Sequence, residues 1–307
     1  MVTAYVERTP RRMTPRGILA ALAGRGLGSV PPPALVLAGI VSVQIGASLA
    51  KQLFPMVGAV GVVSMRLVFS AAILLIAWRP SLRMTGQAWL SVVLFGVVLG
   101  VMNVCFYSAV DRIPLGVAVT IEFLGPLTVA LAGSRRWRDG LWALLAAGGV
   151  VLLTDGGGHV ALAGVLFALG AASMWACYIL LSARIGEQTT GGGGLAIASA
   201  IGGLLVAPFG VATAGAALVR PVVLAAGFGV ALLSSVVPYS VELEALRRIP
   251  PRVFGVLMSL EPAVGALCGL VVLSQGLHPL QWIAVCLVVG ASVGATRTDR
   301  PRPTPES

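Results

Sequence analysis

Two glutamates lie deep inside apolar stretches of the sequence. Glu261 precedes Pro262 in a run that stays apolar to Leu273, and Glu122 lies four residues before Pro126 in a second run. An ionisable residue at the centre of a membrane helix costs about 2.5 to 3.5 kcal/mol and usually faces a cavity or pairs with an opposite charge. Both acids are therefore candidates for binding a cation or exchanging a proton near neutral pH. The alternative for each is a structural pair with a buried arginine.

Arg66 is the candidate positively charged partner of these acids, because it lies near the middle of another apolar run, 57–78. Two interpretations of Arg66 stay open. It binds the carboxylate of a ligand, or it forms a structural salt bridge to one of the glutamates.

Other polar and aromatic side chains recur three or four residues apart within apolar runs, which places each set on one helix face. We expect the binding residues to include, besides Glu122, Glu261 and Arg66, the following: Gln44, Asn103, Tyr107, Trp175, Tyr178 and Tyr239. The alternative is hydrogen bonding between helices, which is favoured for a lone Ser or Gln. For Tyr239 with Glu242 the two interpretations are equal.

Pro126 and Pro262 predict kinks beside the two acids. Proline has no N–H for the carbonyl four residues earlier, which belongs to Glu122 in the first case and Met258 in the second. Irregular backbone at membrane depth is tolerated only against protein or a water-filled cavity. A kink at each position would therefore expose a backbone acceptor next to a carboxylate.

The composition indicates an all-α polytopic membrane protein. Of 307 residues, 57% are hydrophobic and 10% charged, with a mean hydropathy of +0.96, whereas a soluble chain has about 25% charged residues. About 20 apolar residues span a bilayer as a helix. The ten predicted spans are 33–54, 57–78, 87–109, 114–133, 138–154, 161–183, 193–212, 221–246, 252–274 and 278–296.

The spans divide into two related halves. The segment from Arg112-Ile-Pro to Pro126 matches the one from Arg248-Ile-Pro to Pro262 at one constant offset, which indicates an internal repeat. Five spans per half force the second copy to enter the membrane from the opposite side. We therefore predict ten transmembrane helices as two inverted five-helix repeats, with a basic tail (1–32), first repeat (33–155), second repeat (156–297) and second tail (298–307).

Positive charge predicts the orientation. Arginines cluster in alternate connections, whereas the intervening loops hold only Arg112 and Arg220, so both termini should be cytoplasmic. The net charge of +10 is then a topology signal, and no nucleic-acid partner is expected. The four cysteines have no CxxC spacing, and we expect no disulfide, metal or other cofactor.

Several motifs carry a family resemblance. Ala50-Lys51, Met65-Arg66-Leu67, the Ile121–Pro126 segment, Ser234-Ser-Val-Val-Pro-Tyr239 with Glu242, and the Phe254–Pro262 segment stand at characteristic places. Together they resemble the drug/metabolite transporter superfamily with EamA-type repeats. The chain is most similar to the RhtA-type threonine and homoserine exporters.

The resemblance implies an exporter of small amino acids in the bacterial inner membrane, driven by proton antiport, with Glu122, Glu261 and Tyr239 lining or adjoining a central cavity. A lipophilic-drug or other metabolite carrier is the alternative, although 6% aromatic residues argue mildly against it. A non-transporting scaffold is less favoured, and no enzyme site is indicated. Gly290 and Gly294 have a spacing that permits close helix packing, within a monomer or in a homodimer.

Overall fold

The computed structural model describes residues 30–132, 137–155, 160–188, 193–246 and 248–298, and within these ranges all regular structure is helical. The predicted all-helical fold is confirmed for this part of the chain. Most of the predicted basic tail, and all of the second tail except Thr298, lies outside the described residues. The elements are α2 (Pro32–Trp78), α3 (Gly86–Arg112), α4 (Leu115–Glu122), α5 (Leu124–Ala132), α6 (Trp137–Asp155), α7 (Leu162–Gln188), α8 (Gly193–Ala214), η1 (Gly215–Val219), α9 (Pro221–Ala231), η2 (Leu232–Val236), α10 (Val237–Leu246), α11 (Pro251–Met258), α12 (Glu261–Leu273) and α13 (Pro279–Thr298).

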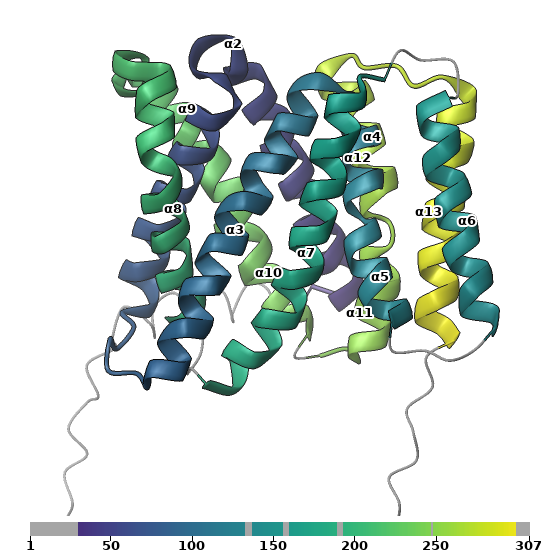
Figure 1. Cartoon of the computed structure of the whole chain (residues 1–307), viewed down its shortest axis with the longest axis horizontal. Helices are drawn as coiled ribbons and strands as arrows, with labels where there is room; N and C mark the ends of the chain where they lie inside the picture. Colours follow the sequence, from purple (N-terminus) through teal and green to yellow (C-terminus); the bar gives the residue numbers. More distant parts are fainter. Residues whose placement is uncertain (1–29, 133–136, 156–159, 189–192, 247, 299–307) are drawn as a thin grey trace, which may run out of the picture.

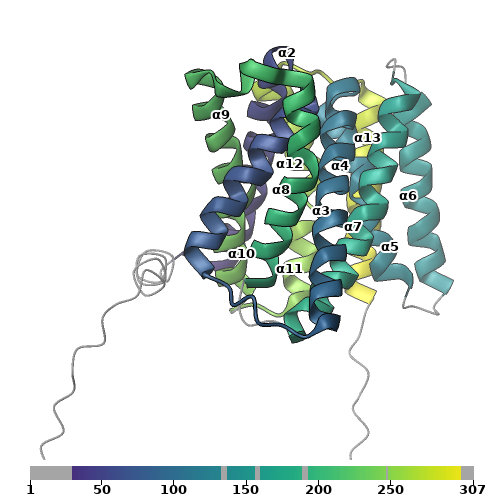
Figure 2. The same ribbon diagram turned by 60° about the vertical axis from the view of Figure 1, so that its left-hand side comes forward.

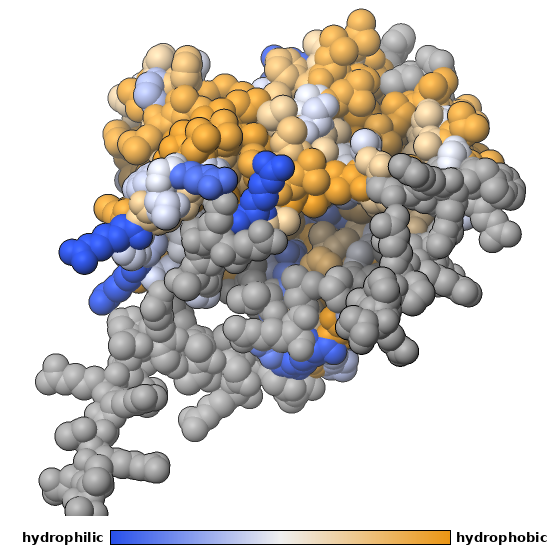
Figure 3. All heavy atoms as spheres, turned by 60° about the horizontal axis from the view of Figure 1, so that its bottom comes forward, coloured by the Kyte–Doolittle hydropathy of each residue, from blue (hydrophilic) through white to orange (hydrophobic). Residues whose placement is uncertain are grey.

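The helices form one bundle in which neighbours run alongside one another (Figures 1 and 2). Six helical runs of the described chain are long and apolar enough to cross a membrane. Their outer side chains are apolar as well: Leu204 is 75% and Val271 77% exposed. Apolar residues cover the side of the bundle, and hydrophilic residues gather at its lower end (Figure 3). Apolar side chains facing outward are expected where lipid is the solvent, so this is a multi-pass membrane protein.

The long helix α2 contains a sharp break that divides it in two. Gly58 has φ 68° and ψ 168°, three residues after Pro55. This backbone region is essentially restricted to glycine. The predicted spans 33–54 and 57–78 both fall within α2, on either side of this break.

Three other helical runs are interrupted near their middles. A single turn residue, Phe123, separates α4 from α5, and Ser259 and Leu260 separate α11 from α12. Between α9 and α10 the chain forms a π-helical turn, η2. Pro126 lies inside α5, and Pro262 lies in the first turn of α12. Each proline thus follows an interruption by a few residues.

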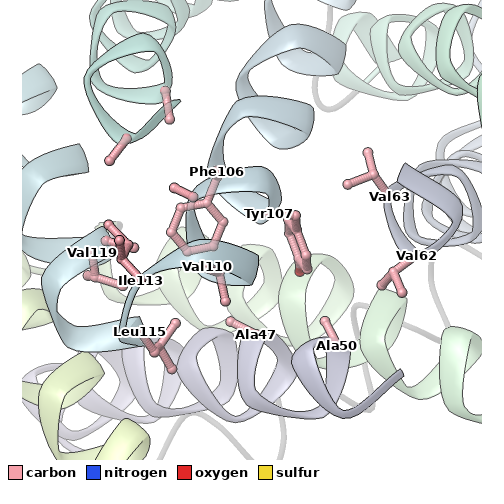
Figure 4. Close-up of a cluster of buried hydrophobic side chains, with 14 of the residues drawn as sticks. Ala47, Ala50, Val62, Val63, Phe106, Tyr107, Val110, Ile113, Leu115 and Val119 are labelled. Atoms are coloured by element: carbon pink, nitrogen blue, oxygen red, sulfur yellow. The ribbon is translucent and has the colours of Figure 1, made fainter. Parts of the chain in front are cut away.

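One of the places where the two halves of the chain pack closely is the crossing of α4 and α12. A Cβ atom added to Gly116 would lie 2.6 Å from Cα of Ala266, and one added to Gly265 would lie 3.1 Å from the Val119 side chain. Small residues at such crossings let helices approach closely. The main apolar core surrounds this contact, with Ala47, Phe106, Val110, Ile113 and Leu115 among its members (Figure 4).

Lys51 joins α2 to the end of α3. Its Nζ donates hydrogen bonds to the backbone oxygens of Val110, at 2.5 Å, and Ile113, at 3.2 Å. The last carbonyls of a helix have no partner within the helix and carry the negative end of its dipole. The ammonium group therefore satisfies otherwise unpaired acceptors at this end of the bundle.

Candidate functional site

A cavity of about 540 Å³ lies between the two halves of the chain. It extends between α5, α7 and α11, because Ala130, Ile179 and Phe254 line it. Of these helices, α5 and α11 lie in the lower half of the bundle in Figure 1, whereas α7 runs over its full height. Its polar lining residues are Gln44, Arg66, Asn103, Glu122, Ser234, Glu242, Glu261 and Ser292. Three carboxyl groups and one guanidinium group therefore share one chamber.

Glu261 is held at the interruption between α11 and α12. Its side chain is only 7% exposed, and Oε1 accepts a hydrogen bond of 3.3 Å from Nε2 of Gln44. Ser259, in the same interruption, shares a hydrogen bond of 2.7 Å with Ser292 of α13. The interruption therefore places the first residue of α12 against α2, while a second contact fixes the preceding turn.

Arg66 is held by two partners, neither of which is an acid. Nη1 donates to the hydroxyl of Tyr107 at 3.0 Å, and Nη2 donates to the backbone oxygen of Ser234 at 3.1 Å. The guanidinium carbon also lies 5.4 Å from the centre of the Tyr107 ring. In the described part of the chain the ion pairs are Asp111–Arg112 and Glu244–Arg248. The alternative of a structural salt bridge between Arg66 and one of the glutamates is therefore not found in the described part of the chain.

Buried polar atoms without partners concentrate at this cavity. Among the described residues, five buried side-chain nitrogen or oxygen atoms have no hydrogen-bond partner, and four of the five belong to cavity-lining residues. They are Gln44 Oε1, Glu261 Oε2, Arg66 Nε and Ser234 Oγ. An unpaired buried polar atom costs about 1 to 3 kcal/mol. Two acceptors and two donors without partners, all in residues that line one chamber, are suited to a ligand that carries both donors and acceptors.

Comparison with known proteins identifies the family. The "EamA-like transporter family" model matches residues 162–297. The chain is 44% identical over 273 residues to "Threonine/homoserine exporter RhtA" of Escherichia coli (strain K12), covering 88% of this chain and 92% of that protein. The chain belongs to the EamA-like transporter family. Its relatives are named as exporters, so it is a membrane transporter and not an enzyme.

Other relatives of this EamA-like transporter agree with the assignment. RhtA of Salmonella typhimurium (strain SL1344) is 43% identical over 276 residues, covering 89% of this chain and 93% of that protein. "Uncharacterized transporter YwfM" of Bacillus subtilis (strain 168) is 25% identical over 254 residues, covering 78% and 85%. Among the solved structures that match, a crystal structure has a TM-score of 0.59 at 20% identity, covering 86% of this chain and 97% of that chain. At that identity the likeness concerns the fold alone.

Most of the residues proposed from the sequence of this EamA-like transporter line the cavity. They are Gln44, Arg66, Asn103, Glu122, Trp175, Tyr178 and Glu261, together with Pro126. Tyr107 instead is completely buried and contacts the chamber through Arg66. Tyr239 lies on α10, but its side chain is outside the described part of the structure.

Aromatic side chains form one wall of the cavity. The Trp175 ring meets Phe123 edge-on, with centroids 5.8 Å apart and planes at 81°. Tyr178 stacks on Phe95 at 4.8 Å. Asn103 donates one N–H of Nδ2 to the backbone oxygen of Leu99 at 2.8 Å, which leaves its amide oxygen and its second N–H for a ligand.

Sequence reasoning missed Ser234 and Ser292, which also line the cavity. Isolated serines in apolar runs give no periodic signal. Ser234, however, precedes Pro238 by four residues, and that spacing predicts a backbone oxygen without its helical donor. Glu242, for which ligand binding and hydrogen bonding between helices were equal interpretations, lines the cavity as well.

Proposed function

We propose that this EamA-like transporter exports small amino acids of the threonine and homoserine type across the bacterial inner membrane, in exchange for protons. The substrate class follows the relatives named threonine/homoserine exporters at 44% and 43% identity. Those relatives are covered over more than nine-tenths of their length.

The open donors and acceptors of the cavity are the observation that supports this proposal most directly. An amino acid carries an ammonium group, which only donates, and a carboxylate, which only accepts. The ammonium group fits the unpaired oxygens of Gln44 and Glu261. The carboxylate fits the unpaired donors of Arg66 and Ser234. A substrate bound in this way satisfies all four atoms at once.

Proton coupling follows from shared use of Glu261. This carboxyl group has no ion-pair partner among the described residues, and Gln44 reaches only one of its two oxygens. A proton on Glu261 removes the negative charge that holds an ammonium group. Proton and substrate therefore compete for the same group, which is the requirement for antiport. Glu122, in the same cavity, is the second acid able to take part.

The architecture that serves this cycle is ten spans in two inverted repeats, 33–155 and 156–297, with both termini and both tails (1–32 and 298–307) in the cytoplasm. The break at Gly58 supports counting α2 as two spans. The family model, at residues 162–297, covers nearly all of the second repeat. Rocking of one repeat against the other would expose the cavity alternately to each side.

Proton-driven flux of radiolabelled threonine in proteoliposomes tests the proposal. Glu261→Gln keeps the shape of the side chain but cannot bind and release a proton. We expect coupled export to fall below about a tenth of the wild-type rate, because both ammonium binding and proton exchange are lost. Asp111→Asn is the matched control, since Asp111 is 45% exposed and pairs with Arg112 outside the cavity. Full proton-coupled export by Glu261→Gln would refute the coupling role.

A further inference from the structure

The helix between α9 and α10 has an unusual backbone pattern beside the cavity. In η2 the N–H of Val237 donates to the oxygen of Leu232, five residues earlier, where an α-helix would use Leu233. The next residue, Pro238, has no N–H to give to Ser234. The backbone oxygens of Leu233 and Ser234 therefore both lose their α-helical donors.

Side chains of α2 take the place of these donors. The hydroxyl of Ser42 donates to the oxygen of Leu233 at 2.7 Å, and Nη2 of Arg66 donates to the oxygen of Ser234 at 3.1 Å. Buried backbone oxygens need a partner, so the π-turn attracts α2 at two points. One of these points fixes the guanidinium group.

Both terminal nitrogens of Arg66 are engaged in this arrangement, one by Ser234 and the other by Tyr107. The nitrogen left open is Nε, and the hydroxyl of Ser234 is the second open donor. The close approach of Gly46 fixes where that hydroxyl lies, because a Cβ added there would come within 2.3 Å of Ser234 Oγ. Arg66 and Ser234 both line the cavity.

We propose that Pro238 and the π-turn build a carboxylate-binding subsite from Arg66 Nε and Ser234 Oγ, so that Pro238 is a positioning residue for substrates with a free carboxylate. The proposal rests on the proposed function and deepens it. A carboxylate offers two acceptor oxygens to two donors, one of them charged. A carboxamide offers one oxygen and one NH₂ group, and the NH₂ group would face a donor. The subsite therefore discriminates an amino acid from its amide.

The test measures binding of threonine and of threoninamide to the purified, full-length protein in slightly acidic buffer, where both probes carry an ammonium group. The wild type should bind threonine more tightly. In Pro238→Ala the new N–H competes with Arg66 for the Ser234 oxygen. We expect the preference for threonine over threoninamide to fall about tenfold, with threoninamide binding little changed.

Pro208→Ala is the matched control, because Pro208 lies inside α8, is exposed and does not line the cavity; its preference should equal the wild type's. Ser234→Ala provides a second variant that leaves the helical backbone unchanged, and it should also lower the preference. If wild type neither binds nor transports threonine, the proposed function is wrong. If wild type does both, but Pro238→Ala keeps the full preference, the subsite is overturned. Should Pro238→Ala fail to fold, an unchanged preference in Ser234→Ala overturns it equally.

Discussion

Replacing Gly116 by Ala tests how closely the two halves of the chain pack. The added Cβ would lie 2.6 Å from Cα and 2.8 Å from Cβ of Ala266, whereas carbon atoms in good contact are about 3.5 to 4.0 Å apart. The nearest atom is backbone, so no side-chain rotation relieves the clash. The helices α4 and α12 must instead separate by about 1 Å, and neighbouring contacts along the crossing weaken as well.

The magnitude follows from a comparison with Gly148→Ala in α6. Gly148 is exposed and has no atom within 4 Å of an added Cβ. The gain in helix propensity is at most about 1 kcal/mol in each substitution, so most of it cancels in the difference. What remains is the cost of overpacking, about 1 to 3 kcal/mol. At about 2 to 4 °C per kcal/mol, Gly116→Ala should unfold about 2 to 12 °C below Gly148→Ala.

Thermal unfolding of the purified variants, followed by circular dichroism at a fixed scan rate, measures this difference. A fixed rate matters because apparent midpoints depend on it when unfolding is irreversible. We expect Gly148→Ala to match or exceed the wild type and Gly116→Ala to fall below Gly148→Ala. Equal midpoints for the two variants would mean that α4 and α12 do not pack at this distance.

Two further predictions concern the backbone and the end of α3. Gly58→Ala should lower stability by about 1 to 3 kcal/mol, because φ is 68° there, although the added methyl group has nothing within 4 Å. An unchanged unfolding midpoint would show that the break does not have this backbone conformation. Lys51→Met should cost about 1 to 3 kcal/mol, because two carbonyl oxygens at the end of α3 lose their donor. Lys51→Arg, which keeps the positive donor, should retain part of the stability, and an equal loss in both variants would contradict this role.

The sequence predicted those features of the fold that repeat or extend along the chain. Apolar runs gave the helices, as shown by α3, which covers Gly86–Arg112 against a predicted span of 87–109. The family resemblance implied that Glu122 and Glu261 line or adjoin a central cavity, and both line the cavity. These features can be predicted because every segment that crosses lipid must be long enough to span it and must be helical, and because a charged residue within it is costly.

Pairings between distant residues could not be predicted in this way. Nothing in the local pattern of Gln44 indicates that its amide reaches Glu261, 217 residues further along the chain. The sequence indicated a ligand or an acid as the partner of Arg66, and it gave no sign that the guanidinium group also binds a tyrosine hydroxyl and a backbone oxygen. The π-turn at η2 shifts the helical register by one residue, too little to disturb an apolar run. Only the position of Pro238 indicated an irregular backbone in this segment.

The interruptions of the helices explain why the cavity lies where it does. Non-helical backbone at membrane depth is unfavourable against lipid and is accepted only against protein or a water-filled space. Phe123, Ser234 and Glu261 each lie at or beside an interruption, and all three line the same cavity. Each precedes a proline by one to four residues. The prolines of three separate helical runs thus bring irregular backbone, and the polar groups it orients, to one place, which continuous helices could not do.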